Sequence, residues 1–252
     1  MMERTIRTEW VGLQSGTGAE AIAIDAYAAI PEAAAGETFS TVVVIQEIFG
    51  VNAHIRDVTE RVAKLGYVAI APAIYQRQIK NFERGYDADA VVEGRKYKEQ
   101  TRADELLRDV HAAMDYGRSL PQGKAGPCGS IGFCFGGHVV YLAATLPDMA
   151  ATASFYGAGI TTWCPGEAGA TVDRTGEIKG RLCGFFGTAD GLIPSDHVDT
   201  IKDALVENGV DHTLHLYDGA DHGFFCDRRG SYNAQAAADA WGHVVALFGD
   251  RL

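Results

Sequence analysis

The stretch of sequence that most constrains the fold is Gly132-Phe133-Cys134-Phe135-Gly136-Gly137. An apolar run at residues 127–131 precedes it, and a segment of helical composition at residues 137–144 follows it. This order of strand, sharp turn and helix is typical of a nucleophile elbow, with cysteine at the position that most elbows give to serine. A thiol in such a turn lies at a helix N-terminus, where backbone N–H groups and the macrodipole stabilise a thiolate.

The motif alone is weak, because the chain contains 30 glycines and five cysteines. The simplest alternative is a turn that carries a small buried thiol. The rest of the chain therefore has to decide between a nucleophile and a structural cysteine.

Length and composition narrow the class of protein. A chain of 252 residues fits one large α/β domain, and we expect a single domain over residues 1–252. The net charge of −11 argues against nucleic acid and anionic membranes as partners, since both require clustered Lys and Arg. The cysteines are odd in number and form no Cys-x-x-Cys pair, which favours reduced thiols.

Residues 1–7 lack the apolar core of a signal peptide, so we expect a cytoplasmic protein.

The pattern along the chain predicts an α/β fold. Alternating residues at 5–11 and 21–27 predict an antiparallel hairpin at a sheet edge, and the β-branched run Thr41–Ile45 predicts a strand covered on both faces. Further strands are expected at residues 67–71, 125–131, 151–156, 181–186 and 213–217, and helices at residues 52–65, 99–118, 138–146, 195–208 and 233–248. Such alternation predicts a mostly parallel sheet with helices on both faces.

Two long segments interrupt this alternation. They cover residues 73–98 and 157–179, and the second directly follows the end of a predicted strand. Ligands of open α/β sheets bind beyond the carboxyl ends of the strands. Both segments are therefore candidate walls of a substrate pocket.

An acid and a histidine follow the elbow in the order found in α/β-hydrolases, each placed after a predicted strand. Asp190 ends Gly187-Thr188-Ala189-Asp190, and His222 lies in the loop after residues 213–217. His222 is expected to accept the thiol proton of Cys134, and Asp190 to orient the imidazole. The oxyanion is expected to bind the backbone N–H groups of Phe135 and Ile48.

Other assignments compete with this triad. Asp190 could be a turn or cap residue, as most loop aspartates are. Asp173 precedes its strand, Asp196 starts a helix and Asp221 is expected to be solvated. The other histidines, at positions 54, 111, 138, 197, 212, 215 and 243, lack a spacing typical of metal ligands, so we expect no metal. No cofactor is expected either.

Glu47 is a carboxylate at the end of the apolar strand, in Gln46-Glu47-Ile48-Phe49-Gly50. It is either a solvent-facing strand end or a pocket carboxylate that meets the thiol of Cys134.

Taken together, these motifs resemble the dienelactone hydrolase family, also called carboxymethylenebutenolidases, which are α/β-hydrolases with a Cys-Asp-His triad. The resemblance rests on segments spread along the chain from position 41 onward: residues 46–50, Ile74-Tyr75-Gln76-Arg77, residues 132–137, Phe155-Tyr156-Gly157, residues 187–190 and His222-Gly223-Phe224-Phe225.

The resemblance implies further roles for individual residues. Glu47 would hold the resting thiol in check until substrate displaces it, and Arg77 would bind an anionic substrate carboxylate. Tyr156 would contribute to substrate binding. One departure affects the substrate: members that cleave dienelactones have an arginine where this chain has Cys226, and Arg228 and Arg229 follow at shifted positions.

The sequence therefore predicts a cysteine-dependent hydrolase of small esters or lactones, acting through a thioester. Its partner would be a small-molecule substrate, anionic if Arg77 binds it, and the sequence sets no oligomeric state. Alternatives are a broad carboxylesterase, a phosphotriester-type hydrolase, and a non-catalytic binding protein on the same scaffold. A redox role would pair Cys134 with Cys226.

Overall fold

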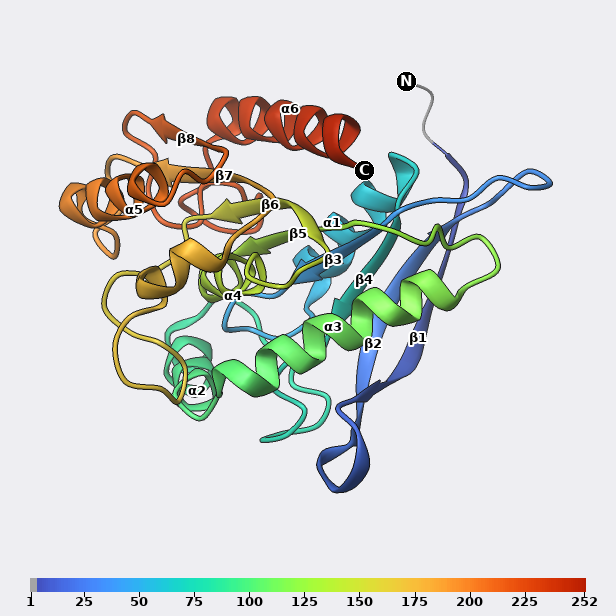
Figure 1. Cartoon of the computed structure of the whole chain (residues 1–252). Helices are drawn as coiled ribbons and strands as arrows, with labels where there is room; N and C mark the ends of the chain where they lie inside the picture. The colour runs from blue at the N-terminus through green and yellow to red at the C-terminus, as the bar shows by residue number, and fades with distance from the viewer. Residues whose placement is uncertain (1–3) are drawn as a thin grey trace.

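The computed structural model describes residues 4–252, so the first three residues of the segment 1–7 lie outside the described part of the chain. Residues 4–252 form an eight-stranded sheet with helices on both faces (Figure 1). The strands are β1 Ile6–Ser15, β2 Ile22–Pro31, β3 Thr41–Ile45, β4 Val68–Pro72, β5 Cys128–Phe133, β6 Met149–Phe155, β7 Arg181–Gly187 and β8 His212–Tyr217.

The sheet order is β1-β2-β4-β3-β5-β6-β7-β8. The pairs β1/β2 and β2/β4 are antiparallel, and every pair from β4/β3 to β7/β8 is parallel. The predicted N-terminal hairpin at a sheet edge and the predicted mostly parallel sheet are both confirmed.

The helices are α1 Ala53–Lys64, α2 Ala88–Lys98, α3 Ala103–Ser119, α4 Phe135–Ala143, α5 Ser195–Glu207 and α6 Ala234–Arg251, with short 3-10 helices at Gly18–Glu20 and Thr171–Glu177. Helices α1 and α6 cover one face of the sheet, and α3 and α4 cover the other (Figure 1). All five residues of β3 are buried, because this central strand lies beneath helices on both sides.

Several predicted element boundaries were wrong. Helix α2 lies in a segment expected to be a loop, and its sequence carries only two buried residues, Ala90 and Gly94, so it lacks an apolar stripe. The predicted helix at residues 99–118 begins at Ala103, and the helix of the elbow begins at Phe135 rather than at residue 138. Helix α6 passes through Gly249 to Arg251. In residues 4–252, no helix is both long and apolar enough to cross a membrane.

The carboxyl ends of the parallel strands meet at one edge of the sheet. Register pairs Ile45 with Gly132, Phe133 with Phe155 and Phe155 with Phe185, so the residues that follow β3, β5, β6 and β7 lie side by side. Strand β8 extends this edge through the pairing of Gly187 with Tyr217. The residues that the sequence predicts for the active site therefore lie along this edge.

Candidate active site

Cys134 sits in a strained turn between β5 and α4. Its backbone has φ 56° and ψ −118°, a conformation that side chains rarely adopt and that costs about 1–3 kcal/mol. The turn is packed tightly against β3: a Cβ on Gly136 would lie 2.4 Å from the Gln46 carbonyl oxygen. Within the turn, a Cβ on Gly132 would lie 2.1 Å from the Gly136 oxygen. These contacts explain the glycines on both sides of the cysteine.

His222 and Asp190 meet beside this turn. His222 Nδ1 and Asp190 Oδ2 are 2.8 Å apart, and the side chain of Asp190 is almost fully buried. The second oxygen of Asp190 accepts a hydrogen bond from the backbone N–H of Leu192 at 2.9 Å. The carboxylate is thereby fixed with one oxygen toward the imidazole.

The protonated form of His222 is strongly favoured. Burial would lower the pKa of His222, but the charge of the Cys134 sulfur and the hydrogen bond to Asp190 raise it to about 10. His222 Nε2 has no hydrogen-bond partner of good geometry in the described chain, so this nitrogen is available to the sulfur or to a substrate.

The competing acids are engaged elsewhere. Asp173 accepts a hydrogen bond from the backbone N–H of Ala170, and Asp196 is exposed in the first turn of α5. Asp221 is exposed and accepts the backbone N–H of His222 at 2.6 Å, which helps to shape the loop of the histidine.

A cavity of about 460 Å³ opens onto Cys134 and His222. Helix α2 contributes Val91, Arg95 and Lys98 to its wall, and the segment after β6 contributes a second group of residues, Ala158, Gly159 and Thr162. Both segments proposed as pocket walls, residues 73–98 and 157–179, therefore supply lining residues. Ile48 and Phe135, whose N–H groups were expected to hold the oxyanion, also line the cavity.

Glu47 is fully buried at the end of β3 and pairs with an arginine from the loop after His222. Its Oε1 accepts a hydrogen bond from Arg229 Nη1 at 2.8 Å, whereas its Oε2 has no hydrogen-bond partner among the described residues. The solvent-facing interpretation of Glu47 is therefore wrong. The arginine that reaches the pocket is Arg229, while Arg228 lines a different cavity with His54 and Tyr86.

Arg229 combines several interactions in one place. Burial lowers the pKa of Arg229, but the charges of Glu47 and Cys134 outweigh this effect and raise it. Its guanidinium also lies over the ring of Tyr86, 5.5 Å from the centroid. It remains a cation in contact with the cavity.

Tyr156 follows β6 with a φ of 36° and is fully buried. Its ring packs edge-on against the imidazole of His222, with the ring centroids 5.2 Å apart. The hydroxyl has no hydrogen-bond partner in residues 4–252. Tyr156 thus contacts the histidine, and it is not one of the residues that line the cavity.

Arg77, expected to bind substrate, points into a different part of the molecule. Its guanidinium binds Asp109 of α3 at 2.5 Å and Ser15 of β1 at 2.8 Å. It is not among the cavity-lining residues, because the buried carboxylate of Asp109 holds it between the hairpin and α3. The structure therefore does not bring Arg77 to the site.

Lys98 is a site residue that the sequence did not reveal. Its ammonium lies over the rings of Trp163 and Phe135, 4.7 and 5.9 Å from their centroids, and no ion pair involves it in the described chain. Burial lowers the pKa of Lys98, and the charge of Cys134 opposes this effect. No signal in the sequence pointed to Lys98, because α2 itself was not predicted.

The chain matches known proteins over most of its length. It is 57% identical over 210 residues to a proposed carboxymethylenebutenolidase of Synechocystis sp. The aligned residues cover 83% of this chain and 85% of that relative. A second proposed carboxymethylenebutenolidase, from Methylorubrum extorquens, is 34% identical over 236 residues, covering 89% of this chain and 76% of that relative.

Solved structures show the same architecture. A proposed dienelactone hydrolase from Klebsiella pneumoniae superimposes with a TM-score of 0.83 at 29% identity, covering 96% of this chain and 99% of that one. A dienelactone hydrolase-like promiscuous phosphotriesterase from metagenomic libraries gives a TM-score of 0.79 at 21% identity, covering 98% of each chain. The second likeness concerns the fold alone.

The fold is that of an α/β-hydrolase, and the protein is a hydrolase that acts on ester or lactone bonds. The dienelactone hydrolase family matches residues 24–252, and the chain belongs to this family.

Proposed function

We propose that this protein is a cysteine-dependent hydrolase of small esters or lactones, with Cys134, His222 and Asp190 as its triad. The observation that carries the proposal is the 2.8 Å contact between His222 and a buried Asp190, beside a cysteine held in a strained elbow at the cavity. A structural cysteine would not need such a turn, since the same small thiol packs without strain in ordinary backbone.

The chemistry proceeds in two halves. The sulfur of Cys134 attacks the acyl carbon and forms a thioester, while the protonated His222 donates its proton to the leaving alkoxide oxygen. His222 then accepts a proton from water, the resulting hydroxide cleaves the thioester, and the sulfur leaves as a thiolate. In a lactone the leaving oxygen stays attached to the acyl group, so the product is a single hydroxy acid.

The oxyanion of each tetrahedral intermediate is proposed to bind the backbone N–H groups of Phe135 and Ile48. Phe135 is the first residue of α4, and the N–H of a first helical residue has no acceptor within its own helix. Both residues line the cavity beside the nucleophile. Preorganised donors of this kind contribute about 3–4 kcal/mol each to stabilising the transition state.

We further propose that the substrate is anionic. Three Arg and Lys side chains, Arg95, Lys98 and Arg229, line the cavity, together with one carboxylate, Glu99. Lys98 is half-buried without a carboxylate partner in residues 4–252, and an arriving carboxylate would supply that partner.

Glu47 is proposed to control the nucleophile. In the resting protein its Oε1 is held by Arg229, and its Oε2 is an unpartnered buried acceptor. A substrate carboxylate that binds Arg229 would compete with Glu47 for this cation. The released Glu47 would reorient, and the ion pair of Cys134 and His222 would become available for attack only when substrate is present.

The test compares ring opening of a dienelactone carboxylate with hydrolysis of a neutral activated ester by the intact protein, Cys134→Ala and Cys164→Ala. Cys164 is a matched control, since it is a buried cysteine near Glu167 and does not line the cavity. Loss of both activities in Cys134→Ala alone supports the proposal. Turnover that survives Cys134→Ala contradicts it. A phosphotriester included in the same panel tests the alternative hydrolase reaction.

A further inference from the structure

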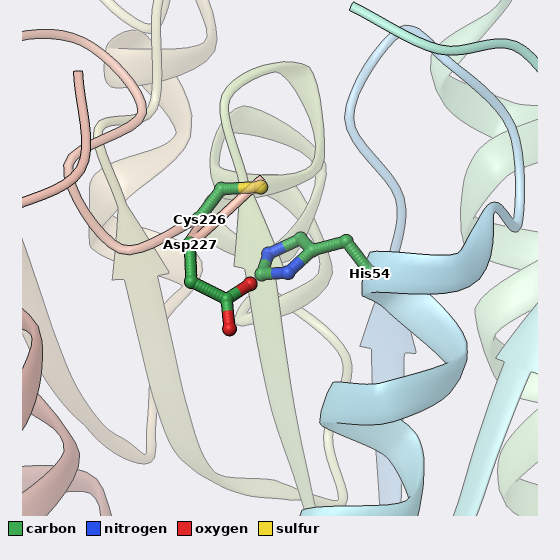
Figure 2. A group of neighbouring side chains, drawn as sticks. All are labelled: His54, Cys226 and Asp227. Atoms are coloured by element: carbon green, nitrogen blue, oxygen red, sulfur yellow. The ribbon is translucent and has the colours of Figure 1, made fainter. Parts of the chain in front are cut away.

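A second group of ligand-type side chains lies outside the triad. It consists of His54 at the start of α1 together with Cys226 and Asp227 in the loop between β8 and α6. One nitrogen, one sulfur and one carboxylate oxygen from these residues all lie within 4.8 Å of one another. Figure 2 shows the imidazole of His54 projecting from α1 toward the loop that carries the other two side chains.

His54 is the unusual member of this group. It is only 1% exposed, yet neither ring nitrogen has a hydrogen-bond partner in the described chain. Its ring instead packs edge-on against Phe133 and Phe225, at centroid distances of 5.7 and 6.2 Å. Burying a polar atom without a hydrogen-bond partner destabilises a protein by about 1–3 kcal/mol. A ligand bound to a ring nitrogen of His54 would remove part of this cost.

The other two residues complete a mixed donor set. Cys226 is fully buried, and its sulfur contacts the hydroxyl of Tyr86 at 3.3 Å. Asp227 is exposed, and its carboxylate lies 3.8 Å from Arg61. A divalent cation carries two positive charges, and one thiolate and one carboxylate supply two negative charges. The complex therefore has no net charge, which limits the electrostatic cost of placing the cation beside neighbouring arginines.

Two members of the group face open space: Asp227 is exposed and His54 borders a cavity, whereas Cys226 is fully buried. His54 lines a cavity of about 530 Å³ together with Asn52, Tyr86 and Arg228. This cavity is separate from the one that opens onto Cys134. It offers an entry path for an ion and room for a water molecule as a further ligand.

We propose that His54, Cys226 and Asp227 form a binding site for Zn²⁺, with a water molecule at the fourth position. Nitrogen and sulfur donors select zinc over Mg²⁺ and Ca²⁺, which require oxygen ligands. Tetrahedral Zn²⁺ holds its ligand atoms about 3.3–3.8 Å apart, so the three side chains need to close by about 1 Å. On binding, the S–H bond of Cys226 breaks, a Zn–S bond forms and the thiol proton passes to the buffer.

The site would brace the loop that carries the cavity arginine. The backbone N–H of Arg229 donates to the carbonyl of Cys226 at 3.2 Å, and the Arg229 guanidinium lies over Tyr86, the residue that contacts the Cys226 sulfur. Bound zinc would therefore anchor the turn from Cys226 to Arg229 to the start of α1.

The test uses the full chain with Cys134→Ser, since the catalytic thiol could itself bind metal. After treatment with chelator, this protein is titrated with Zn²⁺ by calorimetry and with Co²⁺ by absorption spectroscopy. We expect one ion per chain, an absorption band from thiolate-to-cobalt charge transfer, and no binding of Mg²⁺ at the same concentrations. Addition of Cys226→Ala should abolish the band, whereas addition of Cys164→Ala should preserve it.

Asp227→Asn and Asp57→Asn form a matched pair of surface variants, because both carboxylates contact Arg61 and only Asp227 belongs to the group. Asp227→Asn should weaken zinc binding by at least about 10-fold, whereas Asp57→Asn should leave it unchanged. Thermal melting checks that each variant is folded, and neither surface substitution disturbs the core. A cobalt band that survives Cys226→Ala, zinc affinity that is equal in the two aspartate variants, or no binding by the Cys134→Ser protein would overturn the proposal.

Discussion

Arg229 Nη1 donates a hydrogen bond to Glu47 Oε1 over 2.8 Å, and this ion pair joins the loop after the histidine to the end of β3. Glu47 is fully buried, whereas the side chain of Arg229 is 21% exposed and reaches the cavity. The carboxylate therefore depends on one cation, and a substrate can compete for the same cation.

Replacing Arg229 with glutamine should destabilise the protein, because it leaves Glu47 as an uncompensated buried charge. Removing one partner of a buried pair costs about 3–5 kcal/mol, and the partial exposure of Arg229 favours the lower end of this range. Urea unfolding at neutral pH measures the loss. The double variant Arg229→Gln/Glu47→Gln should recover part of the stability, since it removes the stranded charge. A double variant that is less stable than Arg229→Gln alone would contradict this account.

Arg77 gives the second prediction. Because it binds Asp109 and Ser15 away from the cavity, Arg77→Met should lower the free energy of unfolding by about 3 kcal/mol. The KM for a dienelactone should not change. Steady-state kinetics on the folded fraction, together with urea unfolding, separate the two effects. A large rise in KM with unchanged stability would instead support the substrate-binding role implied by the family resemblance.

Most of the fold could be predicted from the sequence, because the strand, turn and helix patterns of successive segments all indicated the same α/β architecture. The β-branched run of β3 predicted both boundaries of that strand, and Cys134, Asp190 and His222 each follow a predicted strand. Since the carboxyl ends of parallel strands share one edge, the placement of these three residues after strands, in the order found in α/β-hydrolases, predicted that they would lie together there.

Arg95 and Lys98, the cations that helix α2 contributes to the cavity wall, could not be predicted from the sequence pattern. Helix α2 begins at a cap formed by Asp87 and packs its Gly94 against the Ile48 carbonyl, but it lacks the apolar periodicity by which helices are detected. The orientation of Lys98 depends on that packing. Arg77 and Asp109 are 32 residues apart, and no pattern in the sequence pairs them.

The pKa of His222 provides a test of its contact with Cys134. It stands at about 10, and the sulfur charge is the largest of the contributions that raise it. In Cys134→Ala the pKa should therefore fall, because burial then acts with less opposition. The imidazole ¹⁵N chemical shifts of the two proteins, followed by NMR between pH 5 and 11, measure the difference. Equal pKa values in both proteins would exclude a close interaction of the sulfur with His222.

The same shift predicts how stability depends on pH. The pKa of His222 is raised above its unfolded value of about 6.5, so its stabilising contribution is fully present below that pH and is lost as the pH rises through about 10. The difference in unfolding free energy between the intact protein and Cys134→Ala should shrink between pH 7 and 10.5. A difference that stays constant over this window would contradict the assignment.

The elbow should store measurable strain. Cys134 has a φ of 56°, which glycine adopts at much lower cost than any residue with a Cβ. Cys134→Gly should therefore be more stable than Cys134→Ala by about 1 kcal/mol, although both variants lack the nucleophile. Denaturant unfolding of the two variants gives the difference. A less stable glycine variant would show that the turn is not strained.

Lys98 is expected to set the preference for anionic substrates. Lys98→Met removes the charge but keeps a long apolar side chain against Trp163, so the cavity wall should retain its packing. The KM for a dienelactone carboxylate should rise by about 10-fold, which corresponds to about 1.4 kcal/mol of lost binding, whereas hydrolysis of a neutral activated ester should change little. Lys96→Met is the matched control, because Lys96 lies on the same helix over the ring of Tyr97 and does not line the cavity. If Lys98→Met and Lys96→Met have the same effect on both substrates, Lys98 does not select the substrate, and Arg95 or Arg229 would have to bind its carboxylate.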